Sequence, residues 1–181
     1  EEGADMQAVM NEDIKAGLLP AGSKIEPWDW WYYAEKVRKA KYDLDEEQTK
    51  PYFKLDNVVR GAFLAAKKLY GVNMEELEGV PSYNTQQVKT FKVTDNDGQL
   101  LGIFTTDWLP RDSKRGGAWM NNVREQYADV KGEMVRPIIV NVGNLQEYLT
   151  IDEVQTVFHE FGHALHGLLT QCTYPSVSGT N

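Results

Sequence analysis

Apolar and polar positions follow a helical period through the first part of the chain, to about residue 79. The spacing predicts helices over residues 4–15, 28–42 and 55–70. Gly71 directly follows the third stretch, and a glycine in this place commonly ends a helix in a left-handed conformation. We therefore expect a helical N-terminal part.

Aromatic residues crowd the start of the second predicted helix, namely Trp28, Trp30, Trp31, Tyr32 and Tyr33. Such a cluster can form a stacking platform for a ligand, or it can pack in the protein interior. Because the cluster belongs to a predicted helix with other elements around it, we expect these rings to be buried against those elements.

The pattern changes in the second part of the chain. Residues 88–94 alternate in polarity, Asp95–Gly98 has the composition of a hairpin turn, and residues 99–106 continue as a strand. A short β-branched run follows at 136–142. Together these segments predict a small, mostly antiparallel sheet.

The turn Asp95-Asn96-Asp97-Gly98 also resembles the beginning of a calcium-binding loop. The last ligand position of such a loop needs a glutamate, but Thr106 stands there, and both flanks have the pattern of strands. A hairpin turn is therefore the prediction.

A further helix is predicted near the end of the chain. Thr150 and Glu153 have the spacing of a capping box, and apolar residues then recur at helical spacing through Val154, Val157 and Phe161. The chain is thus expected to be α+β. At 181 residues we expect a single domain, with a helical part over about 1–79 and the sheet and last helix over about 80–181.

Charge and composition exclude some functions. With a net charge of −8 and no basic patch, nucleic acid and anionic membrane surfaces are poor partners. No stretch reaches the roughly 18 apolar residues that a membrane-spanning helix needs. Cys172 is the single cysteine, so an internal disulfide is excluded. A reducing, cytoplasmic location is the expectation.

The strongest chemical signal is His159-Glu160-Phe161-Gly162-His163. Residues four apart share a helix face, so His159 and His163 can bind one zinc ion through their imidazoles. Glu160 then stands beside the metal, where a carboxylate can take a proton from water. The motif predicts a zinc hydrolase, against the alternative of a chance match on a core helix.

A zinc site needs a third protein ligand. His166 shares the helix face, but it lies roughly 10 Å along the axis from His159, and zinc–nitrogen bonds of about 2 Å cannot span that distance. We expect His166 to pack or to support the site from outside it. The third ligand must come from elsewhere, and a carboxylate is expected.

A basic loop with paired glycines extends over Arg111–Trp119. It lacks the spacing of a phosphate-binding loop. Paired glycines let the backbone approach another chain closely. One hypothesis is that Gly117 and Ala118 contact the substrate backbone, and the alternative is a tight structural loop.

The chain resembles the thimet-oligopeptidase family of zinc peptidases, which includes peptidyl-dipeptidases and oligopeptidase A. The matching segments span nearly the whole chain and include Trp28-Asp29, Pro51-Tyr52-Phe53, Lys114–Met120, Arg136-Pro137, His159–His166, Tyr174-Pro175-Ser176 and Ser178–Asn181. The resemblance implies a zincin-like fold and places the 111–119 loop near the substrate cleft. It also implies that the third zinc ligand is a glutamate beyond Asn181, in a longer polypeptide that completes the site.

These observations predict a zinc metallopeptidase that hydrolyses short peptides, with Glu160 as the general base. The run Lys114–Met120 resembles the peptidyl-dipeptidase branch of the family more than the endo-acting branch. Release of C-terminal dipeptides is therefore the expectation. The alternatives are an endo-acting oligopeptidase, a different zinc hydrolase, and an inactive structural fragment.

Overall fold

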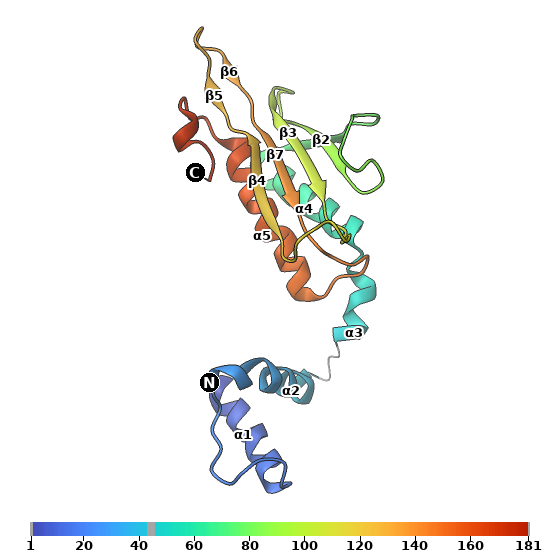
Figure 1. The fold of residues 1–181 in the computed structure, drawn as a ribbon, viewed down its shortest axis with the longest axis vertical. Coiled ribbons are helices and arrows are strands. Elements are labelled where there is room, and N and C mark those ends of the chain that lie inside the picture. Colours follow the sequence, from blue (N-terminus) through green and yellow to red (C-terminus); the bar gives the residue numbers. More distant parts are fainter. Residues whose placement is uncertain (1, 43–45, 181) are drawn as a thin grey trace. The chain divides into compact units, whose positions relative to one another are not determined.

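The computed structural model describes residues 2–42 and 46–180 and divides into two compact units, Glu1–Thr49 and Lys50–Asn181 (Figure 1). Asn181, the last residue of the family-like segment, lies outside the described residues. The division falls at 49/50, inside the part of about 1–79 that the sequence predicted to be helical. The reason is that the helix over 55–70 packs with the sheet. That the chain acts as one domain stays a prediction.

The first unit is helical. It contains α1 (Glu2–Lys15), a 3₁₀ turn (Pro27–Asp29), α2 (Trp30–Tyr42) and the short α3 (Glu46–Thr49). Met6, Met10 and Tyr33 form its buried core. The Tyr33 hydroxyl also donates to Asp13 Oδ2 at 2.9 Å, which ties α2 to α1.

The expected burial of the aromatic cluster is wrong for most of its members. Tyr33 is 3% exposed, but Trp28 and Trp31 are each 78% exposed and Tyr32 is 59% exposed. The physical reason is the helical period. Trp28 lies in the 3₁₀ turn before α2. Within α2 only one side of the helix faces α1, so Tyr33 is buried there while Trp31 and Tyr32 point to solvent.

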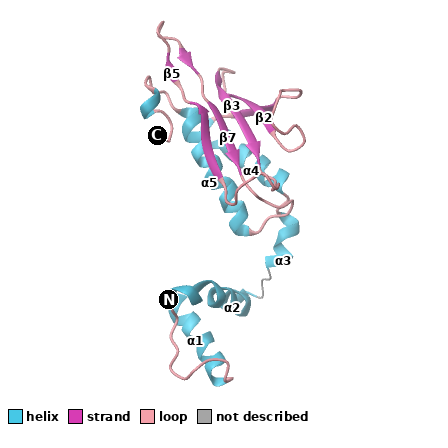
Figure 2. Cartoon of the chain, in the orientation of Figure 1, coloured by secondary structure: helices cyan, strands magenta, loops and turns pink. Residues whose placement is uncertain are grey.

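The second unit combines two long helices with a small sheet (Figure 2). Its elements are a 3₁₀ turn (Lys50–Tyr52), α4 (Leu55–Tyr70), β1 (Asn73–Glu76), β2 (Lys89–Thr94), β3 (Leu100–Asp107), β4 (Trp119–Arg124), β5 (Tyr127–Ala128), β6 (Met134–Val135), β7 (Ile138–Val142), α5 (Ile151–Leu169) and a 3₁₀ turn (Pro175–Val177). The α+β class is confirmed.

The main sheet has the strand order β1-β2-β3-β7-β4, and β5 pairs with β6 in a separate ribbon. β3 and β7 pair in parallel, while the other neighbours in the main sheet are antiparallel. The sheet is therefore mixed, with mostly antiparallel pairing. β4 forms one edge and β1 the other, so β4 has a free edge for hydrogen bonding.

α4 and α5 cover one face of this sheet and contact each other (Figure 1). The core between them is formed by aromatic and aliphatic residues of both layers, including Phe91, Phe104, Ile139, Phe161 and Leu168. The ring centroids of Phe104 and Phe161 lie 5.7 Å apart, which joins β3 to the middle of α5. This packing fixes α5 along the strands β3, β7 and β4.

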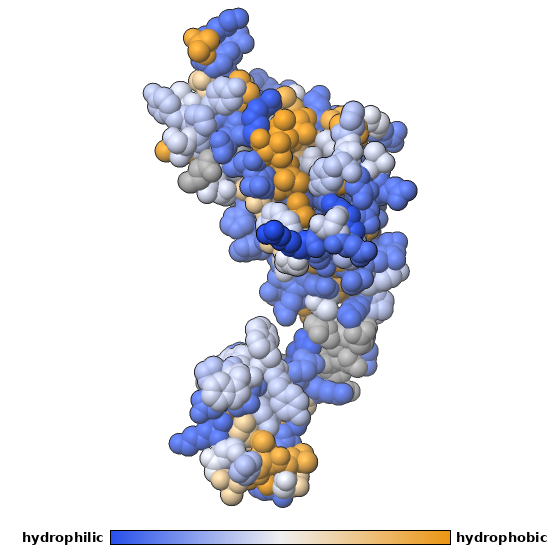
Figure 3. All heavy atoms as spheres, in the orientation of Figure 1, coloured by the Kyte–Doolittle hydropathy of each residue, from blue (hydrophilic) through white to orange (hydrophobic). Residues whose placement is uncertain are grey.

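The other face of the sheet carries an apolar stripe, visible over the strands in Figure 3. Ile103 of β3 pairs with Ile138 of β7, and Val140 continues the row on the same side. All three side chains are half-buried.

Local signals in the sequence account for several element ends. Gly71 adopts a left-handed conformation (φ 70°) and ends α4 as predicted. Asp95 Oδ1 accepts hydrogen bonds from the backbone of Asp97 and Gln99, which confirms the hairpin turn. Among the described helices, none combines the length and apolar character that crossing a bilayer requires.

Candidate metal centre

The helix α5 carries the histidine motif, and its start is fixed by a capping box. The Thr150 hydroxyl accepts from the Glu153 backbone at 3.1 Å, and the Thr150 backbone donates to the Glu153 carboxylate at 2.8 Å. This cap satisfies donors that would otherwise lack partners at the first turn. The predicted cap is confirmed, and it fixes the residue at which α5 begins.

His159 and His163 lie side by side on the exposed face of α5. Their Nε2 atoms are 3.1 Å apart, and their ring centroids are 4.7 Å apart with the planes at 88°. Tetrahedral zinc with bonds of about 2.0–2.1 Å spaces its ligand atoms roughly 3.3 Å apart. The two nitrogens therefore fit two corners of a zinc shell with little adjustment.

Glu160 points to a different side of the helix from the two histidines. Its neighbour in the sequence, His159, is exposed, whereas Glu160 is only 8% exposed and belongs to the inner face with Val157, Phe161 and Ala164. Successive helical residues are turned by about 100°. The carboxylate thus lies at the border between the histidine face and the face that packs on the sheet.

His166 belongs to another part of the surface. It lines a shallow groove of about 420 Å³ together with Tyr70, Gly162, Leu165 and Leu169. The His159–His163 ring pair is formed without it. His166 is exposed, so a packing or supporting role for this side chain stays a prediction.

Gly117 and Ala118 directly precede β4, the edge strand that runs alongside α5 (Figure 1). Gly117 has φ of +98°, a left-handed conformation that favours glycine. Its carbonyl oxygen accepts a hydrogen bond from Asn144 Nδ2 at 2.9 Å. The loop thus lies at the start of the edge strand β4, whereas the histidine pair lies on α5.

A buried ionic cluster lies at the end of β3, where the same loop begins. The Asp107 carboxylate is 0% exposed and accepts from Arg111 at 2.8 and 2.7 Å, from the Tyr83 hydroxyl at 2.9 Å and from Lys114 at 3.2 Å. Burial alone would raise the pKa of Asp107, but these hydrogen bonds outweigh it and hold the pKa below 3.8. Tyr83 is 64% exposed, but its partial burial and then the bond to Asp107 raise the pKa of its hydroxyl to about 12.

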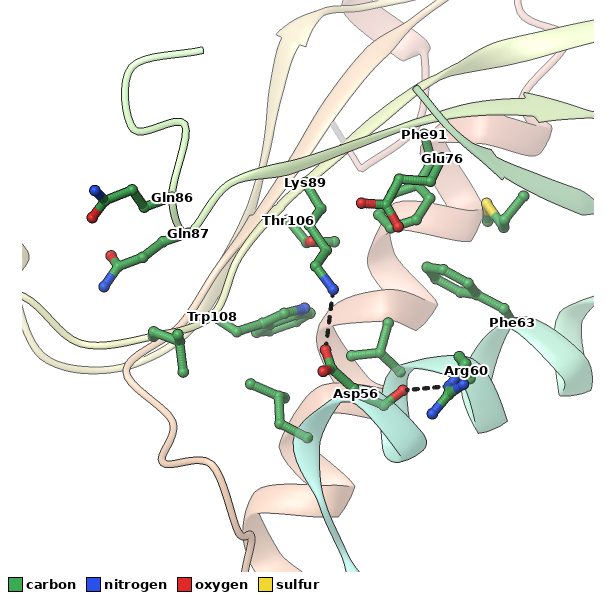
Figure 4. A pocket seen from close by; sticks show the side chains of 14 residues that line it. Asp56, Arg60, Phe63, Glu76, Gln86, Gln87, Lys89, Phe91, Thr106 and Trp108 are labelled. Carbon is green, nitrogen blue, oxygen red and sulfur yellow. Dashed lines mark hydrogen bonds and ion pairs between the residues drawn. The ribbon is translucent and has the colours of Figure 1, made fainter. Parts of the chain in front are cut away.

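A more enclosed pocket of about 550 Å³ lies away from the histidines, between α4 and the strands β1 to β3 (Figure 4). Phe63 and Phe91 form part of its apolar wall, and Trp108 closes one side. An ion pair of Asp56 with Lys89, at 3.2 Å, crosses its mouth. Its lining residues come from 55–109, so the pocket and the histidine motif occupy different sites.

The described residues do not form a complete metal site. Within 2–42 and 46–180, no group of three or more His, Cys, Asp or Glu side chains is arranged to hold a metal ion. His159 and His163 are therefore a pair of candidate ligands that needs at least one more protein ligand.

Sequence reasoning missed three parts of this region, namely the edge strand β4, the cluster around Asp107 and the hydrogen bonds of Asn144. Two signals were present. Asp107 and Arg111 are four residues apart at a strand end, and Asn144 follows a predicted strand. Neither signal shows which residues form hydrogen bonds with each other, because the pairing is set by tertiary packing.

Comparisons with known proteins bear on the whole chain. The model of peptidase family M3 matches residues 1–181. Dipeptidyl carboxypeptidase of Escherichia coli (strain K12) is 42% identical over 189 residues, which cover 100% of this chain and 26% of the relative. Oligopeptidase A of the same strain is 36% identical over 163 residues, covering 86% of this chain and 24% of the relative. Organellar oligopeptidase A of Arabidopsis thaliana is 38% identical, and the match covers 93% of this chain and 23% of the relative. The chain spans about a quarter of the length of these relatives.

Proposed function

The chain belongs to peptidase family M3, and from that premise we propose that it carries the core of the active site of a zinc metallopeptidase that hydrolyses short peptides. The similarity to oligopeptidase A and dipeptidyl carboxypeptidase confirms the resemblance that the sequence alone suggested. One observation carries the proposal: the Nε2 atoms of His159 and His163 converge to 3.1 Å on the exposed face of α5.

Each residue of the motif has a role that fits its place. His159 and His163 would hold the zinc ion from one face of α5. Zinc in such a site polarises a carbonyl and lowers the pKa of water. Glu160 would take the proton of the attacking water and pass it to the leaving amine, a role that suits a carboxylate beside the histidine face.

A third ligand is part of the proposal. Two imidazoles supply half of a tetrahedral shell, and the resemblance implies a glutamate from further along the longer polypeptide. The curated relatives are about four times as long as this chain, which leaves room for such a residue. The partner that completes the site is therefore the rest of the same polypeptide, and the substrate is a short peptide.

Edge strand β4 offers a place for that peptide. Its free edge faces away from β7, and an extended peptide can add to such an edge through main-chain hydrogen bonds. Gly117 and Ala118, at the start of β4, would contact the substrate backbone. We propose release of C-terminal dipeptides, which is supported by 42% identity to a dipeptidyl carboxypeptidase, with internal cleavage as the alternative.

The test uses the full-length protein that contains residues 1–181. Treatment with a zinc chelator should abolish hydrolysis of a short fluorogenic peptide, and added zinc should restore it. The His163→Ala variant should contain less zinc and should stay inactive after zinc is added. Full activity in the chelated protein would refute the proposal.

A further inference from the structure

We propose that Asn144 is a positioning residue for peptide binding, because it holds the segment 115–118 in the conformation that meets the substrate. This inference rests on the proposed function. It goes beyond the motif on α5, since it assigns a role to a side chain outside that helix. Two anchors on either side of the segment carry the argument.

The first anchor is the buried cluster at the end of β3. Asp107 is fully buried and is clamped by both terminal nitrogens of Arg111, which also lies over the Tyr83 ring at 5.5 Å. Paired bonds between a guanidinium and a carboxylate fix orientation as well as distance. The loop therefore leaves β3 in a defined direction.

Lys114 extends this anchor toward the glycines. Its side chain is 4% exposed, and its ammonium group donates to the carbonyl oxygens of Asp107 and Leu109, each at 2.8 Å. A buried ammonium without partners would be strongly unfavourable, so these contacts hold Lys114 in place. The residue directly before Arg115 is thereby fixed.

The second anchor is Asn144. Its Nδ2 atom donates to the carbonyl oxygens of Arg115 at 2.7 Å and of Gly117 at 2.9 Å. A single amide group thus bridges the turn on both sides of Gly116. Because Gly116 and Gly117 have wide backbone freedom, this segment would sample many conformations without the bridge.

Asn144 is itself held against the first anchor. The backbone of Gly143 donates to the carbonyl oxygen of Asp107 at 2.8 Å, and the backbone of Leu145 donates to that of Trp108 at 2.8 Å. The residues on both sides of Asn144 are therefore bonded to the end of β3 and the start of the loop. The two anchors form one rigid frame around the segment.

This frame has a consequence for binding. A segment that is ordered before the substrate arrives does not lose its freedom on binding, so preorganisation strengthens affinity. The carbonyl oxygens of Arg115 and Gly117 already have a donor in Asn144. The contacts with a peptide therefore fall to the remaining backbone groups of the segment, including those of Ala118.

The experiment compares two asparagines in the full-length protein. Asn144→Ala removes the bridge. Asn73→Ala is the matched control, because Asn73 Nδ2 also donates to two loop carbonyl oxygens, of Gly71 at 3.3 Å and of Asp95 at 3.1 Å. Asn73 lies on β1, at the opposite edge of the sheet from β4. The measurements are the zinc content, kcat, KM and melting temperature.

We expect Asn144→Ala to raise KM about tenfold, the effect of losing one or two hydrogen bonds, while kcat and zinc content change little. Both variants lose two hydrogen bonds and should lower the melting temperature by similar amounts. Asn73→Ala should nevertheless leave KM unchanged. An equal rise of KM in both variants, or none in Asn144→Ala, would overturn the inference.

Hydrogen exchange separates this inference from the proposed function. Amides of residues 115–118 should exchange faster in Asn144→Ala than in the parent, and Asn73→Ala should leave them unchanged. Unaltered exchange in Asn144→Ala would refute the positioning role whatever the activity. A parent protein without peptidase activity would instead refute the proposed function, and the role in substrate binding with it.

Discussion

The Nε2 atoms of His159 and His163 lie 3.1 Å apart, within hydrogen-bonding distance, because residues four apart share one face of α5. The capping box at Thr150 fixes where α5 begins, and its apolar face sets the rotation of this helix on the sheet. Both histidines thereby lie on the exposed side of α5. Local sequence thus accounts for the placement of the two candidate zinc ligands.

Zinc should bind weakly to residues 1–181 alone. Two imidazoles give half of a tetrahedral shell, and the loss of hydrogen-bonded partners outside the shell already costs about 10- to 100-fold in affinity. Losing a carboxylate ligand should cost more. Titration calorimetry should show weak binding that His163→Ala removes, while helix content by circular dichroism stays unchanged. Tight one-to-one binding would show that no further ligand is needed.

The full-length protein should release dipeptides from the C-terminus of short peptides. A free terminal carboxylate is then part of what the enzyme recognises, so a C-terminal amide should slow cleavage sharply. Mass spectrometry of the digests identifies the products. Internal cleavage that is insensitive to the amide would favour the endo-acting alternative.

Two glycines of α5 should respond in opposite ways to alanine. A Cβ atom at Gly167 would lie 2.3 Å from Ile139 Cδ1, so Gly167→Ala should destabilise the fold by about 1–3 kcal/mol. No atom lies within 4 Å of a Cβ atom at Gly162, so Gly162→Ala should stabilise the helix by up to about 1 kcal/mol. Urea unfolding of residues 1–181 compares them. Equal effects would contradict the packing of α5 on β7.

The ionic cluster should make stability depend on acid. The pKa of Asp107 is lower in the folded protein than its usual value, so its ionised form favours folding. The contribution is complete above the unfolded pKa of about 3.9 and is lost as the pH falls through the folded value. Unfolding in urea from pH 7 to pH 3 should show this loss, and Asp107→Asn should show less of it. Identical pH profiles of the parent and Asp107→Asn would show that Asp107 does not cause the acid dependence.

Sequence patterns predicted the long elements well because each has a strong local signal. α4 ends at Gly71 and α5 begins after Thr150, as expected. The hairpin at Asp95 is likewise encoded by its own side chain. In all three cases the stabilising contact lies within a few residues of the element that it defines.

Features that depend on distant partners escaped the prediction. β4 has consecutive asparagines and no clear alternation, so its strand conformation depends on pairing with β7. The exposure of Trp31 and Tyr32 depends on which face of α2 meets α1. The hydrogen bond from Asn144 to the Arg115 carbonyl oxygen forms only when these two distant segments fold side by side.

The most direct test of the central claim is the Glu160→Gln variant of the full-length protein. Glutamine keeps the size of the side chain and leaves both imidazoles in place, but it cannot take a proton from water. The variant should retain the zinc content of the parent and lose about 10²- to 10⁴-fold in kcat. Hydrolysis at the parental rate, with zinc in place, would contradict the claim that Glu160 is the general base.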